Sequence, residues 1–392
     1  MPKVCIIGAG PAGSTASLYL SKNKIDHIVI DKAVFPRNII CGEAFRGSSI
    51  YWSLKHIDES YFDELTSILE ASNWVRLINH KNEQLKVNLG NLLSLSGRRL
   101  DFDDFLVQKM KLSPYLSFIE GHTPKNIQYI PHQGFELEVD GTIIKVKILI
   151  IATGATSVLP QKLGIPAPKS PQKIIGFRAH YQKVALEEGS NDVYFLDFLQ
   201  GGYLCILPLN QGYFNILLVL KDTYLKKEQH KVKALFQQCL AHEYIQARFK
   251  YAILCDRAKG KFVYLQTGKI PLSTDHLMIA GAAGIAVNPI TGFGVGHSMT
   301  TGRFAAIRAV EALAANDFSA SFLKHYDKSI LKKLQHERIV SSIKTSLLKR
   351  PKIIHQLIHF FSTRRFFSTL FVQEDFAHNF YNWSYYWRHF WK

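Results

Sequence analysis

Three glycines near the start of the chain have the spacing of a nucleotide-binding turn. The apolar segment Pro2–Ile7 is followed directly by Gly8, Gly10 and Gly13, and a helix-forming run begins at Ser14. Glycine at such positions permits a tight turn, lets the backbone approach a pyrophosphate and lets the helix pack on the strand. The first N–H groups of the helix would then face the phosphates. The pattern predicts a dinucleotide site, and the alternative is a glycine turn that binds nothing.

A second apolar segment supports the dinucleotide interpretation. His27–Ile30 ends in the carboxylate of Asp31. An acidic residue about 20 positions beyond the glycine turn is where dinucleotide-binding proteins hold a ribose hydroxyl. We therefore expect Asp31 to bind a ribose.

Four further motifs follow in order, each of them modest evidence alone. They are Phe35-Pro36-Arg37 with Cys41-Gly42-Glu43, Arg99 with Phe102-Asp103 and Leu106, Ile151-Ala152-Thr153-Gly154, and Gly281-Ala282-Ala283-Gly284 with Asn288-Pro289-Ile290-Thr291-Gly292. In this order the chain resembles the FAD-dependent oxidoreductases of the geranylgeranyl-reductase branch. That branch lies within the p-hydroxybenzoate-hydroxylase-like superfamily, which also includes flavin halogenases. The resemblance covers residues 1 to 310, approximately.

The resemblance implies an FAD site built from these motifs. Backbone at Gly281–Gly284 can approach the ribityl chain, and the helix that follows Gly294 would point its N-terminus at the isoalloxazine ring. The positive end of a helix stabilises negative charge on a reduced ring. The implied cofactor-binding residues are Gly8, Gly10, Pro11, Ala12, Gly13, Asp31, Lys32, Arg37, Cys41, Gly42, Arg99, Thr153, Gly154, Gly281, Ala282, Pro289, Gly292, Phe293 and Gly294.

The resemblance also indicates where a substrate would lie. The segment Tyr203–Pro208 resembles the family's Tyr-x-Trp-x-Phe-Pro strand, with Cys205 in place of the Trp and Leu207 in place of the Phe. The identity of the substrate therefore does not carry over. The implied substrate-binding residues are Glu43, Tyr203, Cys205, Leu207 and Pro208.

Cys41 is the candidate catalytic residue, because in some prenyl reductases a cysteine in this loop lies near the reacting ring. Its thiol could donate a proton to the carbanion left by hydride addition, or orient the substrate. The alternative is a buried structural thiol.

Three residues depart from the family pattern. Ala282 stands where the family has an aspartate that binds the ribityl hydroxyls, Thr153 where hydroxylases carry the Asp of an Asp-Gly pair, and Ile39 where a lysine is usual. Each lost carboxylate removes a hydrogen-bond acceptor worth roughly 1 kcal/mol. We expect FAD to bind, but less tightly than in the family at large.

No metal site is predicted. His355 and His359 are four residues apart, which is close enough on a helix to share a metal, but no acidic or third ligand stands near them in the sequence. We predict two packed or surface histidines. The five cysteines are odd in number and form no CxxC pair, so we expect free thiols.

Apolar patterning indicates the elements that position these residues. After the opening β-α-β unit we expect a helix at Tyr61–Ala71, a hairpin around Asp140-Gly141 and a buried parallel strand at Lys147–Gly154. The fold class predicted is α/β: a doubly wound Rossmann-type FAD-binding domain with an antiparallel-sheet substrate domain and a C-terminal helical extension. The domain bounds are 1–72, 96–160 and 266–325 for FAD, 73–95 and 161–265 for substrate, and 326–392 for the extension.

The basic charge of the chain is concentrated at its C-terminus. The net charge is +17, and Leu331–Lys392 holds eleven lysines and arginines against three acidic residues, with 14 aromatics. Trp383, Trp387 and Trp391 would share one helical face. This composition suits an interfacial helix on anionic lipid. The alternative is a helix that docks its aromatic face on the substrate domain. No nucleic-acid-binding motif accompanies the charge.

The sequence therefore predicts an FAD-dependent oxidoreductase that reduces double bonds of an apolar, prenyl or polyene-like substrate, with NAD(P)H as reductant. One alternative is an FAD-dependent monooxygenase or a halogenase-like enzyme, and another is a flavin-fold binding protein without catalysis. Because a strand begins at residue 2 or 3 and no apolar stretch has the length of a membrane span, we expect a cytoplasmic protein, with peripheral membrane attachment through the tail as an option. Oligomeric state is not predicted.

Overall fold

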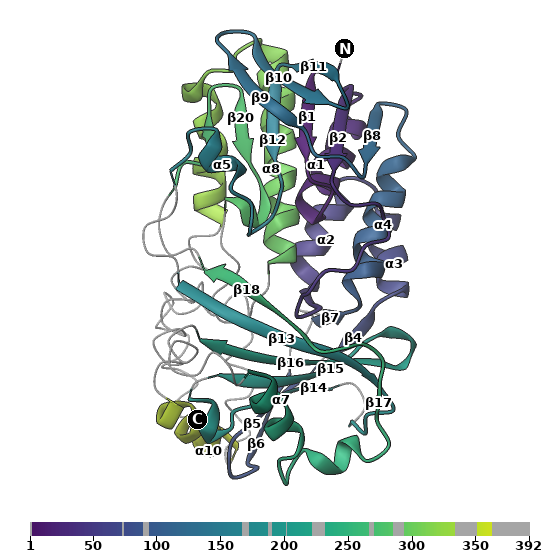
Figure 1. Cartoon of the computed structure of the whole chain (residues 1–392), viewed down its shortest axis with the longest axis vertical. Helices are drawn as coiled ribbons and strands as arrows, with labels where there is room; N and C mark the ends of the chain where they lie inside the picture. Colours follow the sequence, from purple (N-terminus) through teal and green to yellow (C-terminus); the bar gives the residue numbers. More distant parts are fainter. Residues whose placement is uncertain are drawn as a thin grey trace, which may run out of the picture.

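The computed structural model describes residues 2–72, 74–88, 94–166, 172–186, 190–200, 202–221, 232–265, 270–284, 294–333 and 351–362. Two large sheets dominate it, one at each end of the long axis (Figure 1). The predicted fold class is confirmed.

The first sheet is mostly parallel and carries the glycine turn. Its six strands lie in the order β19-β20-β12-β1-β2-β8, and only β19 runs antiparallel to its neighbour. Ile6 at the centre of β1 pairs with Val29 on β2 and Ile150 on β12. The strands are β1 (Val4–Ile7), β2 (His27–Asp31), β8 (Leu116–Glu120), β12 (Ile148–Ile151), β19 (Ser273–Thr274) and β20 (Leu277–Ile279).

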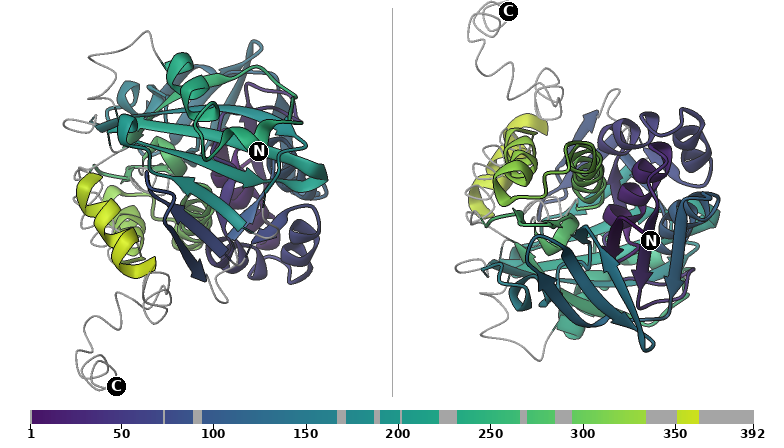
Figure 2. Two further views of the ribbon diagram at one scale, coloured as in Figure 1. Left: turned by 90° about the horizontal axis from the view of Figure 1, so that it is seen from below. Right: turned by 90° about the horizontal axis from the view of Figure 1, so that it is seen from above.

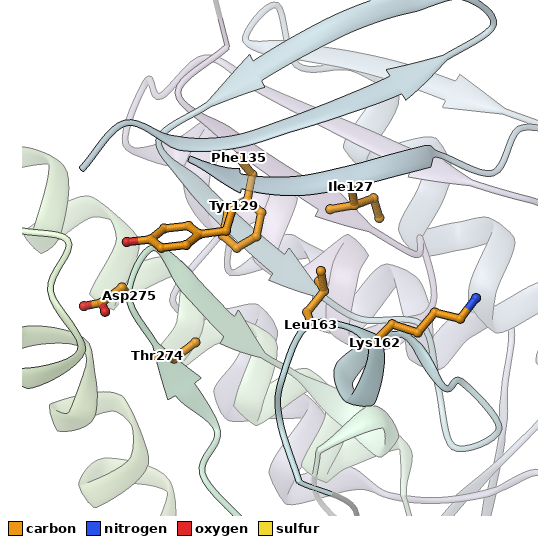
Figure 3. Close-up of a pocket in the computed structure, with 7 residues that line it drawn as sticks. All are labelled: Ile127, Tyr129, Phe135, Lys162, Leu163, Thr274 and Asp275. Atoms are coloured by element: carbon orange, nitrogen blue, oxygen red, sulfur yellow. The ribbon is translucent and has the colours of Figure 1, made fainter. Parts of the chain in front are cut away.

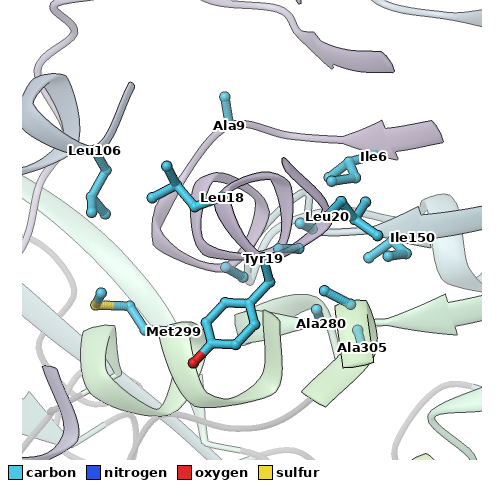
Figure 4. Packing of buried hydrophobic residues seen from close by; sticks show 14 of the residues in the cluster. Ile6, Ala9, Leu18, Tyr19, Leu20, Leu106, Ile150, Ala280, Met299 and Ala305 are labelled. Atoms are coloured by element: carbon cyan, nitrogen blue, oxygen red, sulfur yellow. The ribbon is translucent and has the colours of Figure 1, made fainter. Parts of the chain in front are cut away.

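Both faces of this sheet are covered, which explains the unbroken apolar strands. Ile6 and Ile150 face α1 and α8, where Leu20 and Ala305 pack around them (Figure 4). Cys5 and its alternating neighbours face the small β11-β10-β9 sheet. The covering elements are α1 (Pro11–Lys22), α4 (Arg99–Lys111), α8 (Val295–Ala315), β9 (Lys125–Ile130), β10 (Gly134–Val139) and β11 (Thr142–Val146).

Helices α1 and α8 approach each other closely because their contact is made of small residues. A Cβ on Gly302 would lie 2.0 Å from the carbonyl oxygen of Ala12. The two helix starts are thereby held together, which brings the two glycine-rich segments of the sequence side by side.

The second sheet is largely antiparallel and has eight strands. Seven lie in the order β17-β13-β16-β15-β14-β5-β6, and β18 pairs with β13. One face packs on α7 (Val232–Leu240), where Phe236 is fully buried. Figure 2 shows this sheet from below. The strands are β5 (Trp74–Ile78), β6 (Gln84–Asn88), β13 (Gln172–Gln182), β14 (Ser190–Tyr194), β15 (Tyr203–Pro208), β16 (Tyr213–Lys221), β17 (Ile253–Leu254) and β18 (Lys259–Leu265).

Short elements lie between the two large sheets, and a further helix packs on the second of them. A three-stranded sheet, β3-β7-β4, lies between them, and the later helix α10 packs on β6. No helix in the described ranges is long and apolar enough to cross a membrane. The remaining elements are β3 (Ala44–Arg46), α2 (Gly47–Lys55), α3 (Ser60–Ser67), β4 (Glu70–Ser72), β7 (Ser94–Ser96), α5 (Leu159–Lys162), η1 (Asp197–Leu199), η2 (Asn210–Gly212), η3 (Gln246–Phe249), η4 (Gly281–Ala283), helical residues 320–333 and α10 (Pro351–Ser362).

Local predictions are mostly confirmed, with one correction. The hairpin at Asp140-Gly141 forms with positive φ at both residues, as a two-residue turn of this type requires. The helix expected over Tyr61–Ala71 instead ends at Ser67, and Glu70–Ser72 forms β4 because it pairs with β7. Tertiary pairing has overridden helix propensity there.

Candidate functional site

Gly8 and Gly13 of the glycine turn leave no room for a side chain. Gly8 has φ +104°, and a Cβ there would lie 2.5 Å from the carbonyl oxygen of Ala152. A Cβ on Gly13 would lie 1.7 Å from the carbonyl oxygen of Gly8. Helix α1 starts at Pro11, with Gly10 as an N-cap that offers no side-chain acceptor. The first N–H groups of α1 are therefore available to an anionic group.

Asp31 is buried against this turn. Its Oδ2 accepts a hydrogen bond from the N–H of Ala9 at 2.6 Å, and its Oδ1 accepts one from Ala33 at 2.8 Å. The carboxylate thus braces the glycine turn itself. Its expected role toward a ribose stays a prediction.

Basic side chains gather beside the turn. A Cβ on Gly10 would lie 3.3 Å from Nη2 of Arg37, and this guanidinium lies 3.3 Å from Asp103 Oδ2. Arg99 holds the same carboxylate with two hydrogen bonds, 2.8 and 2.7 Å long. Burial and these two arginines lower the pKa of Lys261 on β18. Two arginines share the one carboxylate of Asp103, and Lys261 lies close to them, so the cluster keeps an excess of positive charge that suits a diphosphate.

The Cys41–Glu43 loop runs from this basic cluster to the large sheet. Burial opposes the charge on Arg99, but Asp103 and, after it, the neighbouring Cys41 raise the pKa of this guanidinium, so the thiol lies near Arg99. The side-chain amide of Asn215 on β16 donates to the carbonyls of Cys41 and Gly42, at 3.2 and 3.1 Å. The thiol therefore lies where the two sheets meet.

Glu43 is almost completely buried and fully hydrogen-bonded. Its Oε2 lies 2.6 Å from His180 Nε2 and accepts from Asn215 at 2.9 Å, while its Oε1 accepts from the backbone N–H of Arg99 at 3.1 Å. Its backbone has φ +59°, an uncommon conformation for a residue with a side chain. The structure holds this carboxylate in one place rather than leaving it free to line a cavity.

His180 continues the network toward the surface. Asp256 Oδ2 lies 3.2 Å from His180 Nδ1 and accepts from Arg178 Nη1 at 2.9 Å. Burial opposes charge on the imidazole, but hydrogen bonds to Asp256 and Glu43 prevail and raise the pKa of His180. Burial also opposes ionisation of Asp256, yet its hydrogen bonds to His180 lower its pKa to about 2. The groups follow in the order Glu43 carboxylate, His180 imidazole and Asp256 carboxylate, and Nη1 of Arg178 lies 2.9 Å from His180 Nδ1.

The sequence did not point to Lys261, His180, Asp256 or Asn215. A weak signal exists for one of them, because Arg178 and His180 alternate within an otherwise apolar strand and so share a face. That face points toward the Cys41–Glu43 loop.

The second glycine-rich segment meets the first. Gly281 has φ +66°, and a Cβ there would lie 2.9 Å from the Cβ of Ala12. Its N–H donates to Oγ1 of Thr301 on α8 at 2.8 Å. Ala282 lies in the same short turn, and Gly294 is the N-cap of α8 without a side-chain acceptor. Pro289, Gly292 and Phe293 lie outside the described residues.

Two further predicted cofactor residues follow β12 beside the glycine turn. The hydroxyl of Thr153 is buried and makes no hydrogen bond within the described part of the chain. Gly154 has φ +82°, with nothing near the position of a Cβ. An unsatisfied hydroxyl, two uncapped helix starts and the basic cluster all fit a flavin dinucleotide.

The predicted substrate strand has one face toward this region. Cys205 on β15 pairs with Leu217 on β16, and Leu217 Cδ2 would lie 3.2 Å from a Cβ on Gly42. Tyr203 and Leu207 alternate with the residues that pack on α7, so they share the face of Cys205. Burial raises the pKa of Cys205 to about 12, which keeps that thiol protonated.

A separate cavity of about 350 Å³ lies elsewhere, between the β9–β10 hairpin and β19. Tyr129 and Leu163 point into it, and none of the predicted site residues lines it (Figure 3). We do not assign the predicted chemistry to this cavity.

Comparisons with known proteins find similar oxidoreductases. Residues 2–195 match the family described as pyridine nucleotide-disulphide oxidoreductase. The digeranylgeranylglycerophospholipid reductase of Methanocaldococcus jannaschii is 25% identical over 372 residues, which cover 87% of this chain and 85% of the relative.

Solved structures share the fold. A geranylgeranyl bacteriochlorophyll reductase-like protein from Thermoplasma acidophilum superposes with a TM-score of 0.83 at 18% identity, covering 96% of this chain and 94% of that one. The halogenase PltM, in complex with phloroglucinol and FAD, gives a TM-score of 0.76 at 15% identity over 93% and 84% of the two chains. These findings confirm the predicted resemblance and the oxidoreductase class, and they support FAD as the cofactor.

Proposed function

We propose that this chain, which resembles the geranylgeranyl-reductase-like flavoproteins, reduces carbon–carbon double bonds of an apolar prenyl lipid with electrons from NAD(P)H. The observation that carries the proposal is the position of Cys41: its thiol lies near Arg99, and its backbone carbonyl accepts a hydrogen bond from Asn215 of the large sheet. The prenyl-lipid reductase named among the relatives supports the substrate class.

Double-bond reduction adds a hydride to one carbon and a proton to the other. When bound, reduced FAD supplies the hydride. Cys41 donates the proton, and the positive charge of Arg99 beside its sulfur stabilises the thiolate that remains. The apolar face of β15 and β16, with Cys205 and Leu217, holds the lipid chain and keeps water away from this step.

The thiolate must recover a proton before the next turnover. His180, which contacts Glu43 of this loop and has a raised pKa, can carry that proton. Asp256, whose side chain is 26% exposed, connects it to solvent. We assign to His180 and Glu43 the resupply of this proton, which comes from water.

A halogenase-like or monooxygenase reaction is the second candidate, because the FAD-bound halogenase shares the fold. Such chemistry needs oxygen, whereas the thiol donor at Cys41 is what a reduction needs. We also propose that the basic, aromatic tail attaches the protein to an anionic membrane surface, where an apolar lipid substrate resides.

The test is FAD uptake followed by product analysis. Purified protein is soaked with FAD and given NADPH and a glycerophospholipid with geranylgeranyl chains. We expect flavin absorbance and products that gain two hydrogens for each double bond lost. Gly10→Val is the control, because its side chain would meet Arg37 and block the diphosphate position. An oxygenated or halogenated product, or no flavin uptake, would overturn the proposal.

A further inference from the structure

Three side chains from distant parts of the chain meet beside the edge strand β6 of the large sheet. His80 lies in the turn between β5 and β6, Asp197 in η1 and His355 in α10. Asp197 Oδ1 lies 3.3 Å from Nδ1 of His80 and 3.1 Å from Nε2 of His355. The three candidate ligand atoms all lie within 4.8 Å of one another. This corrects the expectation that His355 has no acidic group or further ligand nearby.

The two distances to Asp197 are close to those between ligands of a zinc site. Zinc binds imidazole nitrogen and carboxylate oxygen at about 2.0–2.1 Å, so ligands of a tetrahedral ion lie about 3.4 Å apart. The rings of His80 and His355 meet edge to face, at a centroid distance of 4.2 Å and an angle of 87°. They approach the same point from two different elements.

The imidazole nitrogens are not satisfied by the protein alone. Nδ1 of His80 and Nδ1 of His355 are buried, and neither makes a hydrogen bond within the described residues. Nδ1 of His80 is also the atom that faces Asp197. At His80, coordination to a metal through Nδ1 would remove the energetic cost of a buried nitrogen without a hydrogen bond. His355 would coordinate through Nε2, the nitrogen that faces Asp197.

We propose that His80, Asp197 and His355 bind a Zn²⁺ ion, with a water molecule in the fourth position. Two imidazoles and one carboxylate are suitable ligands for this ion. The carboxylate side chain is 65% exposed, so the ion can enter from solvent. The site is separate from the flavin residues and does not depend on the proposed reaction.

The ion would fasten α10 to the large sheet. The apolar contact there is small, with Ile358 of α10 packing on Leu85 and Val87 of β6. One turn further along α10, His359 Nδ1 lies 2.7 Å from Glu83 Oε1. A metal shared by η1, the β5–β6 turn and α10 would add a connection that these contacts lack.

The test is zinc binding by the full chain after treatment with a chelator. We expect calorimetric titration with ZnCl₂ to show one saturable site, and zinc to raise the melting temperature and slow hydrogen exchange in residues 351–362. His80→Ala and His355→Ala should each weaken binding by at least about tenfold. His359→Ala is the matched control on the same helix and should bind as the parent does.

Should either histidine variant fail to fold, Asp197→Asn serves instead, because this side chain is exposed. A parent protein that binds no zinc overturns the proposal. So does binding that is equally tight in His80→Ala, His355→Ala and Asp197→Asn, since the ion would then lie elsewhere.

Discussion

Glu43 Oε2 lies 2.6 Å from Nε2 of His180, although 137 residues separate them in the sequence. This contact joins the loop that carries Cys41 to the middle of the large sheet. It places a titrating imidazole behind the thiol that we assign as proton donor, and it makes the chemistry sensitive to pH.

Turnover should follow the protonation of His180. Its pKa is raised above the usual 6.5, so the imidazolium persists to a higher pH than in a free histidine and is lost as pH rises through the folded-state pKa. We expect kcat to fall on that alkaline side. His180→Gln should lower kcat by about 10²-fold and abolish this pH dependence, with KM and flavin content nearly unchanged. A variant with a normal rate and an unchanged pH profile would contradict the role.

The same network should shape stability against pH. His180 has a raised pKa in the folded state, so its contribution to the free energy of unfolding is full below pH 6.5 and lost as pH rises through the folded pKa. Asp256 has its pKa lowered from 3.8 to about 2, so its contribution is present above pH 3.8 and lost as pH falls through about 2. The free energy of unfolding, measured with urea at each pH, should fall less at alkaline pH in His180→Gln than in the parent. It should fall less at acid pH in Asp256→Asn. If both variants showed the same pH dependence of the free energy of unfolding as the parent, these ionic contacts would not contribute to stability as described.

Two cysteines face the site and should behave differently. Cys41 lies beside Arg99, whereas Cys205 is buried with a pKa of about 12. Cys41→Ala should reduce turnover by about 10²-fold and leave FAD uptake intact. Cys205→Ala is the matched control and should keep a rate within a few-fold of the parent. Equal losses in the two variants would mean that Cys41 is a packing residue.

The tail should bind anionic membranes. Each basic residue near such a surface contributes on the order of 1 kcal/mol, and salt screens the effect. Deleting Glu374–Lys392 should reduce sedimentation with phosphatidylserine vesicles and preserve folding and flavin content. Collapse of the truncated protein would indicate a docked aromatic helix instead, and unchanged binding would exclude a membrane role for this segment.

The sequence predicted those elements that are specified by residues adjacent in the chain. Gly8, Gly10 and Gly13 need no distant partner to specify a turn, and the alternation in Tyr203–Pro208 is set by the strand itself. The structure therefore confirms those elements. Helix propensity at Tyr61–Ala71 was misleading because β7 supplies a pairing partner for Glu70–Ser72.

The network and the histidine cluster could not be predicted because their members lie far apart. Asp256 and Lys261 come to the Cys41 region only through the pairing of β17 and β18 with β13. The sequence neighbours of His355 include no acidic or third ligand, while Asp197 and His80 reach it through folding. Single-sequence patterns report spacing along one element and not contacts between elements.

A single turnover without oxygen distinguishes reduction of a double bond from oxygenation. Protein loaded with FAD is reduced with dithionite, mixed anaerobically with a geranylgeranyl glycerophospholipid and followed by flavin absorbance and product mass. We expect oxidised flavin to reappear in step with the loss of one double bond for each flavin, and more slowly in Cys41→Ala. Flavin that stays reduced until oxygen is admitted, with an oxygen atom in the product, would contradict it.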